Sequence, residues 1–421
     1  MAIHKHNRQY DLVVFGATGY TGKLAAEAIA KSLPTDLKWA IAGRSEAKLK
    51  AVAETCKALN PDRLQPAIEI ADVSDGTRVK ALVSKTFVFL AVVGPYCKYG
   101  EVAFKACAEA GTHYLDVTGE SPWVLSMTQK YEAVAKASGA IMIPQSGLDS
   151  VPSDICTWQL ATTLREELNV KTKDVVISSH KLKIIPSGGT ISTVLSAFGV
   201  FSVDELRKGY EPYSQSPIPR NPSLKDPYSG ITKALFGCFS VPDLGLLTSS
   251  PLGRTDATQV GRSWGLLKTI PSRKDQFYGD NFTWTPGMKA RNWLAGVAIH
   301  WLQVSTLALL FLLPPLRTLA ARFVTQPGEG ASKEEAAKCE TEYRGTATAD
   351  SNTKKKAYIR AWYDGDGYTL TAIFLTQAAL TVLEDDLELG GGVFTPACLG
   401  QSFVDRTEAQ GFKTETQIMD H

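Results

Sequence analysis

The sequence predicts an α/β protein that opens with a parallel β-sheet wound on both sides by helices and continues into a second domain. Short apolar strands recur through the first 143 residues, stretches rich in alanine, lysine and glutamate separate them, and a glycine-rich turn follows the first strand. Continuously apolar strands are typical of a sheet buried on both faces, and helical spacers are typical of crossovers between parallel neighbours. With 421 residues the chain also exceeds one typical domain.

The predicted elements alternate along the first third of the chain. Strands are expected at residues 12–15, 39–42, 67–70, 87–93, 114–117 and 141–143. Helices are expected between them, most clearly at 22–33, 45–58 and 99–110. The right-handed rule for crossovers then fixes the hand of this doubly wound sheet.

The glycine-rich turn lies in the stretch DLVVFGATGYTGKLAAEAIA, residues 11–30. A GxxGxxG turn between a strand and a helix lets a phosphate approach bare backbone N–H groups at the positive end of the helix. Gly16 is expected to form the tight turn, Gly19 to admit a pyrophosphate, and Gly22 to let helix and strand pack. The residues between them, Ala17, Thr18, Tyr20 and Thr21, complete the predicted cofactor loop. The alternative is a tight turn that has no role in binding a nucleotide.

The end of the second strand favours NADP over NAD. An NAD site usually has Asp or Glu there to accept from the ribose 2′-hydroxyl, whereas this chain has Gly43, Arg44 and Ser45. Arg44 can pair with a 2′-phosphate while Ser45 donates alongside, although an ordinary surface arginine is the alternative. Asp72 follows the third strand, where the adenine edge usually lies, but a solvated aspartate at a strand end is equally ordinary.

The fourth strand ends in VVGPY, which places Gly94, Pro95 and Tyr96 at a carboxyl end of the predicted sheet. The crevice outside the carboxyl ends of such strands is where an α/β sheet binds its ligand. We therefore expect the backbone of these three residues to contact the nicotinamide half of the cofactor.

Several motifs together resemble the saccharopine dehydrogenase-like oxidoreductases, a group that includes the trans-acting enoyl reductases. They are GATGYTG at 16–22, AGRSEAKL at 42–49, VVGPY at 92–96, GLDSVPSD at 147–154, SGGT at 187–190, PGEGAS at 327–332 and GGVFTPA at 391–397. The resemblance implies a Rossmann domain, a second α/β domain with a mixed sheet, and a C-terminal helix that returns to the first domain. We expect these parts at 1–155, 156–390 and 391–421. Alternating strand patterns at 340–350 and 355–365 agree with a second sheet.

The expected function is NADPH-dependent reduction of an apolar substrate. Saccharopine dehydrogenases bind a dicarboxylic amino acid, which needs clustered arginines, and none occur near 147–154 or 187–190. Trans-acting enoyl reductases reduce a C=C bond of a carrier-bound acyl chain, which needs an apolar slot and few charges. The alternatives are reduction of a C=N or C=O bond, and a membrane-surface scaffold that binds nucleotide without turnover.

The predicted catalytic residues are Tyr96, Asp149 and Ser150, because a reductase needs a hydroxyl or carboxyl that can stabilise or protonate the reduced product. Other polar side chains follow predicted strands or begin the next helix: Tyr114, Asp116, Thr118, Glu120 and Asp154. Thr118 and Ser150 could instead cap local turns, and Asp154 suits the first turn of a helix. Tyr131 and Lys136 are one position too far apart for the Tyr-x-x-x-Lys pair of short-chain dehydrogenases.

A second signal is the stretch 293–316, which contains no charged residue and is long enough to span a membrane. About 20 apolar residues can cross a bilayer, but Pro314 and Pro315 and several polar residues interrupt the stretch, so an anchor on a membrane or lipid-droplet surface fits better. Four tryptophans, at 264, 284, 293 and 301, suggest an interfacial belt. Some relatives associate with lipid droplets, so the resemblance favours this reading. The alternatives are a buried core helix or a homodimer contact.

The composition indicates which partners and which compartment to expect for the protein. The net charge of +2 gives no basic excess for nucleic acid, so no nucleic-acid partner is expected. Seven scattered cysteines, with no CxxC pair and no Cys/His cluster at metal-ligand spacing, indicate free thiols and no metal site. The polar first ten residues leave no room for a signal-peptide core. We therefore expect a cytoplasmic protein, peripheral on a membrane if 293–316 is an anchor.

Overall fold

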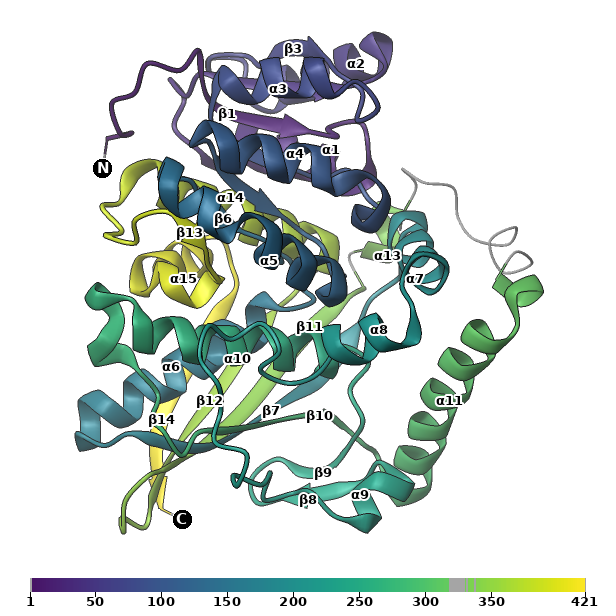
Figure 1. Cartoon of the computed structure of the whole chain (residues 1–421), viewed down its shortest axis with the longest axis vertical. Helices are drawn as coiled ribbons and strands as arrows, with labels where there is room; N and C mark the ends of the chain where they lie inside the picture. Colours follow the sequence, from purple (N-terminus) through teal and green to yellow (C-terminus); the bar gives the residue numbers. More distant parts are fainter. Residues whose placement is uncertain (1, 318–329, 331, 337, 421) are drawn as a thin grey trace.

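The computed structural model describes residues 2–317, 330, 332–336 and 338–420, which form two seven-stranded sheets (Figure 1). Sheet A has the order β13-β6-β5-β4-β1-β2-β3 and all its strands run parallel. Its strands are β1 Tyr10–Phe15, β2 Trp39–Gly43, β3 Ala67–Ile70, β4 Thr86–Ala91, β5 His113–Asp116, β6 Ile141–Ile143 and β13 Gly392–Val393. The parallel sheet that the sequence predicts is confirmed.

Alternate residues of β1 show why its sequence is apolar throughout. Leu12 and Val14 are fully buried in one core, and Val13 and Phe15 are buried in another on the opposite face of the sheet. One face is covered by α1 Tyr20–Ser32, α2 Glu46–Leu59 and α14 Gly367–Glu384; the other is covered by α3 Gly76–Ser84, α4 Tyr96–Ala110 and α5 Ser121–Ser138. The sheet is therefore doubly wound.

Sheet B is mixed, with the order β14-β12-β11-β7-β10-β9-β8. Its strands are β7 Thr172–Lys183, β8 Phe239–Val241, β9 Gly245–Thr248, β10 Thr283–Lys289, β11 Glu340–Ala349, β12 Lys355–Tyr363 and β14 Lys413–Asp420. Strand β10 is parallel to β7, and the other pairs are antiparallel. Helices α6 Val151–Leu168 and α10 Gly253–Thr269 pack on this sheet. The second α/β domain with a mixed sheet is confirmed.

The C-terminal part of the chain connects the two sheets. Helix α14 packs beside α1 on sheet A, and 15 of its 18 residues are buried, which explains why its sequence is apolar on all sides. The predicted segment 391–421 is divided in the structure. Strand β13 extends sheet A beside β6, α15 Gln401–Ala409 packs on α14, and β14 pairs with β12 in sheet B.

The uncharged stretch 293–316 forms α11 Trp293–Leu312, which stands at one side of the molecule and contacts sheet B at β9 (Figure 1). Only Gly296 of this helix is buried, so the alternative of a buried core helix is wrong. The predicted belt of four tryptophans is also wrong. Trp264 and Trp284 are buried on α10 and β10, and Trp293 and Trp301 alone lie exposed on α11.

The remaining described helices are mostly short. These are α7 Gly188–Val200, α8 Val203–Gly209, α9 Ile231–Phe236 and α13 Lys333–Ala336, and the 3₁₀ turns are η1 Pro271–Gln276 and η2 Pro396–Leu399. Most of the PGEGAS motif at 327–332 lies outside the described residues.

Candidate cofactor and substrate cavity

The register of sheet A brings the predicted site loops to one edge. Phe15 is paired with Ala42 on one side and with Ala91 on the other, so the loops after these three strands leave the sheet together. Ala91 is in turn paired with Asp116, and Leu115 with Ile143. The loops that begin at residues 16, 44, 71, 92, 117 and 144 therefore share the carboxyl edge, where α/β sheets bind their ligands.

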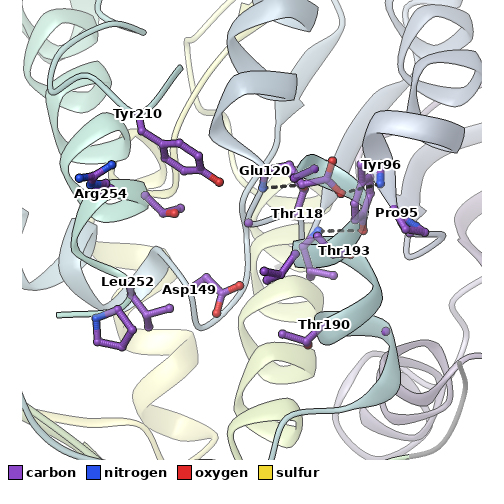
Figure 2. A pocket seen from close by; sticks show the side chains of 18 of the residues that line it. Pro95, Tyr96, Thr118, Glu120, Asp149, Thr190, Thr193, Tyr210, Leu252 and Arg254 are labelled. Carbon is purple, nitrogen blue, oxygen red and sulfur yellow. Dashed lines mark hydrogen bonds between the residues drawn. The ribbon is translucent and has the colours of Figure 1, made fainter. Parts of the chain in front are cut away.

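A single cavity of about 2350 Å³ begins at this edge and extends to the second domain. On the side of sheet A it is lined by the glycine turn, by residues 92–96 and by residues 117–120. On the other side its walls come from α7, α8, the start of α10 and α11. Figure 2 shows the middle of the cavity, with Asp149 and Thr118 facing Tyr210 and Leu252.

The glycine turn has the geometry that the sequence predicts for its three glycines. Gly16 has φ +97, and a Cβ there would lie 2.8 Å from the Val92 carbonyl oxygen. A Cβ on Gly22 would lie 2.2 Å from the Gly16 carbonyl oxygen, so α1 can pack this closely only on a glycine. A Cβ on Gly19 would have one neighbour within 4 Å, the Gly16 carbonyl oxygen at 3.3 Å, and this residue lines the cavity. Gly19 is thus the glycine left open toward a ligand.

The other residues of the turn either line the cavity or pack in the core of the domain. Thr18, Tyr20 and Thr21 line the cavity, whereas Ala17 and Gly22 do not. Ala17 is fully buried in the core beneath the turn. The Tyr20 ring lies edge-on to Tyr368 at the start of α14, with ring centroids 5.2 Å apart. Residues of the turn thus contribute both to the cavity and to the packing of α14.

The cations at the end of β2 suit a phosphate. The Arg44 side chain is 80% exposed and lines the cavity. Lys48, in the first turn of α2, lines the same region. The sequence analysis missed it because it lies beyond the strand end. Ser45 caps α2 by accepting from the Lys48 N–H at 3.4 Å, and it does not line the cavity. This position gives no support to the predicted role of Ser45 as a donor to the 2′-phosphate.

Asp72 lines the cavity beside Arg44. Its Oδ1 accepts from the Ser74 N–H at 2.8 Å and from the Ser74 hydroxyl at 2.7 Å. These two bonds, with the charge of Arg44, lower the pKa of Asp72. Asp72 is therefore an ionised turn residue at the edge of the cavity.

Gly94, Pro95 and Tyr96 line the cavity as a group. The Tyr96 hydroxyl donates to the Ala91 carbonyl at 2.8 Å and accepts from the Val117 N–H at 3.3 Å, which ties the ends of β4 and β5 together. Burial raises the pKa of Tyr96 well above its usual value. This hydroxyl has a structural role at the strand ends, and the catalytic role predicted for it stays a prediction.

Glu120 organises the same edge. Its two carboxylate oxygens accept from the Tyr96 N–H at 2.7 Å and the Cys97 N–H at 2.8 Å, so it caps α4. Thr118 accepts from the Glu120 N–H at 3.1 Å (Figure 2). Burial raises the pKa of Glu120 despite these bonds. Both residues hold the loop 117–120 in place against the cavity.

Of the predicted catalytic residues in the loop 147–154, Asp149 lines the cavity and Ser150 does not. No described residue hydrogen-bonds the Asp149 carboxylate, which packs against Gly119. Burial raises the pKa of Asp149 to about 6, so it can hold a proton near neutral pH. Ser150 is the N-cap residue of α6, and its buried hydroxyl has no partner among the described residues. A proton-donor role for Ser150 does not fit this position.

Two other candidate acids are structural. Asp116 accepts from the N–H groups of Thr118 and Gln145 and from the Tyr114 hydroxyl, and burial raises its pKa to about 7. Asp154 accepts from the Ser263 hydroxyl and from the Ala397 N–H at 2.9 Å. Asp154 lies in the first turn of α6, as the sequence predicts, and its carboxylate also joins α6 to α10 and η2.

The second domain contributes side chains that the sequence analysis missed. Tyr210 follows α8, Arg254 begins α10, and both line the cavity. Arg207, Arg220 and Lys233 line it as well. The search for arginines near 147–154 and 187–190 could not find these cations, because they are distant in sequence from the motifs and only folding brings them to the cavity.

Comparisons with known proteins agree with this geometry. A family model described as "Saccharopine dehydrogenase NADP binding domain" matches residues 12–143. The chain is 31% identical over 97% of its length to 98% of "Putative trans-acting enoyl reductase" from Mycobacterium tuberculosis. It is 29% identical over 96% of its length to 97% of "Trans-acting enoyl reductase" from Mycobacterium bovis. Apo saccharopine dehydrogenase (L-Glu forming) from Saccharomyces cerevisiae has a similar fold, with a TM-score of 0.53 at 12% identity, covering 97% of this chain and all of that one.

Proposed function

Since this chain belongs to the saccharopine dehydrogenase-like oxidoreductases, the family of the trans-acting enoyl reductases, we propose that it uses NADPH to reduce a C=C bond of an apolar acyl chain. The NADP-binding domain and the full-length relatives make it an NADP-dependent oxidoreductase. The observation that supports the proposed substrate is the cavity itself. It passes from the glycine turn between α7 and α10 to the apolar helix α11.

The residues at the edge of sheet A fit NADP(H). The open Gly19 at the start of α1 suits the pyrophosphate, and Arg44 with Lys48 suits the 2′-phosphate. The loops 92–96 and 117–120 would then hold the nicotinamide end. Bound NADPH supplies a hydride to the substrate. The chain's own part is to orient the substrate and to supply a proton.

The wall of the second domain supports an acyl chain over a dicarboxylate. Apolar side chains from three helices line the outer part of the cavity: Val194, Ala197 and Phe198 from α7, Leu206 from α8, and Leu302, Val304 and Leu307 from α11. Such walls bury methylene groups at little cost. Two of the cations in this wall are already paired, Arg207 with Asp204 and Lys233 with Asp226.

A direct assay separates the alternatives. NADPH oxidation should be followed with an α,β-unsaturated thioester, free and carrier-bound, and with matched ketone and imine substrates. We expect turnover of the unsaturated thioester and none of saccharopine with NADP⁺. Turnover of a carbonyl or imine alone would favour the C=O or C=N alternative. Tight NADPH binding with no turnover of any substrate would favour the scaffold.

We also propose that α11 lies in the surface of a lipid layer. Among the described helices, α11 alone is long and apolar enough to cross a membrane by length and composition, with a mean hydropathy of 1.7. Leu294 is 74% exposed and Leu302 is 66% exposed. The six residues 304–309 are all exposed, and Val304, Thr306 and Leu307 among them also line the open cavity.

The exposed apolar residues along α11 favour lipid over a second copy of the chain. They extend from Leu294 to Leu312, a length over which a lipid surface can take apolar side chains among its acyl chains. Cations stand at both ends of the helix, Lys289 and Arg291 before it and Arg317 after it, and they suit anionic headgroups. Homodimer formation through α11 is the outcome that would contradict this proposal.

A further inference from the structure

Tyr210 presents a hydroxyl to the middle of the cavity. It follows Gly209 at the end of α8, and a Cβ on Gly209 would lie 2.5 Å from Pro122 Cα, so α8 is pressed against the start of α5. This contact fixes where Tyr210 stands. In Figure 2 its hydroxyl points across the cavity toward the loop that carries Thr118 and Glu120. No described residue hydrogen-bonds this hydroxyl, whereas the backbone N–H of Tyr210 donates to the carbonyls of Leu206 and Lys208.

The other hydroxyls considered for catalysis are engaged or hidden. Tyr96 is bonded through its hydroxyl to the ends of β4 and β5, and Ser150 lies outside the cavity lining. Tyr213 lines the cavity three residues after Tyr210, but its hydroxyl donates to the Phe282 carbonyl at 3.3 Å. Among these groups Tyr210 alone combines a position in the cavity with a hydroxyl that is free to act.

Arg254 completes the arrangement. It lies beside Tyr210 in Figure 2, lines the cavity, and has no ion-pair partner among the described residues. Burial and the carboxylates of Glu120 and Asp149 raise the pKa of Tyr210 to about 12, and the charge of Arg254 opposes this rise. The hydroxyl is therefore protonated at neutral pH, and a cation is present that would stabilise its conjugate base.

We propose that Tyr210 donates the proton in the reduction and that Arg254 stabilises the phenolate that remains. This inference rests on the proposed function. After the hydride has been added at the β-carbon of the unsaturated thioester, an electron pair remains on the α-carbon and carbonyl oxygen. The O–H bond of Tyr210 breaks as a C–H bond forms at the α-carbon. The phenolate then regains a proton from water, so one C=C bond has gained one hydride and one proton.

The first test compares Tyr210→Phe with Tyr213→Phe. Each variant removes one hydroxyl from the same wall, and only the first should lower kcat, by at least about 100-fold, the usual contribution of a positioned acid. NADPH affinity should be unchanged in both. Arg254→Gln should lower kcat by a smaller factor. Full activity of Tyr210→Phe would overturn the proposal. If the wild-type protein reduces a carbonyl or imine instead, the proposed function fails, but the same comparison still tests Tyr210.

A second measurement needs no turnover. Oxidised NADP⁺ carries a positive nicotinamide, which should lower the pKa of a nearby phenol relative to NADPH. Tyrosine ionisation, measured by absorbance at alkaline pH, should therefore begin at lower pH with NADP⁺ than with NADPH. This difference should be present in the wild-type protein and in Tyr213→Phe, and lost in Tyr210→Phe. A difference that persists in Tyr210→Phe would place the hydroxyl away from the reacting centre and overturn the proposal.

Discussion

Arg44 Nε lies 3.8 Å from Asp72 Oδ2, across the loops that follow β2 and β3. The pair is solvent-exposed and long, and Asp72 is already bonded twice by Ser74. An exposed ion pair of this kind contributes little to stability. The Arg44 charge is therefore available to a phosphate.

Arg44→Gln should weaken NADPH binding and leave NADH binding nearly unchanged. One charge-assisted contact to the 2′-phosphate corresponds to about 1.5–3 kcal/mol, or about 10- to 150-fold in Kd. Fluorescence titration of both cofactors measures it. Arg78→Gln, at another exposed arginine paired with an aspartate, is the matched control and should bind both cofactors like the wild type. Equal affinities of the wild-type protein for NADPH and NADH would contradict the assigned role of Arg44.

Gly19→Val and Gly22→Val should fail in different ways. Valine at 19 extends into the cavity, so the chain should fold while NADPH binding is lost. Valine at 22 would clash with the Gly16 carbonyl, where even a Cβ lies at 2.2 Å, so this variant should unfold or melt at much lower temperature. Circular dichroism and cofactor fluorescence together distinguish the two. Retained binding in Gly19→Val would show that the turn serves another purpose.

Asp149 should make the protein less stable as the pH rises. Its pKa is raised from 3.8 to about 6, so between about pH 4 and pH 6 the folded chain holds a proton that the unfolded chain releases. The free energy of unfolding therefore falls across this range, by up to about 3 kcal/mol at about 1.4 kcal/mol per pH unit. Asp149→Asn cannot ionise and should remove this fall, which urea unfolding at several pH values measures.

Asp72 provides the control for that prediction, because its contribution to the free energy of unfolding changes with pH in the opposite direction. The pKa of Asp72 is lowered, chiefly by the Ser74 N–H, so ionised Asp72 favours the folded chain above about pH 4. Asp72→Asn should therefore lose stability at neutral pH and keep it in acid. If the free energy of unfolding of Asp149→Asn depends on pH as that of the wild type does, the prediction is wrong and the Asp149 carboxyl is hydrated in the folded protein.

Serine at Leu302, Leu307, Leu309 and Leu312 should reduce flotation with vesicles of anionic phospholipid and leave the melting temperature nearly unchanged. All four leucines are exposed, so their loss removes little packing from the core. Leu59→Ser and Leu64→Ser, at exposed leucines in the first domain, are the controls and should float like the wild type. A wild-type dimer that dissociates in the α11 variant, with no vesicle binding by either, would assign the helix to a second copy.

The sequence by itself determined the first domain and its cofactor. Apolar runs with helical spacers can bury both faces of a strand only in a doubly wound sheet, and Gly16, Gly19 and Gly22 act within a single turn whose contacts are local. Arg44 follows the second strand directly, so its place is fixed by chain connectivity. These features depend on neighbours a few residues away, and for that reason they can be identified without coordinates.

Only the tertiary structure decided which polar groups face the substrate. Tyr96 and Tyr210 are both tyrosines beside a helix end, yet the hydroxyl of Tyr96 is bonded to Ala91 and Val117 while that of Tyr210 is open to the cavity. Arg254 reaches the same cavity from α10, more than 100 residues from the loop of Asp149. Likewise α11 is apolar enough for a core, and its exposure follows from where the second domain places it. Packing between elements distant in sequence sets each of these outcomes, and no local pattern records it.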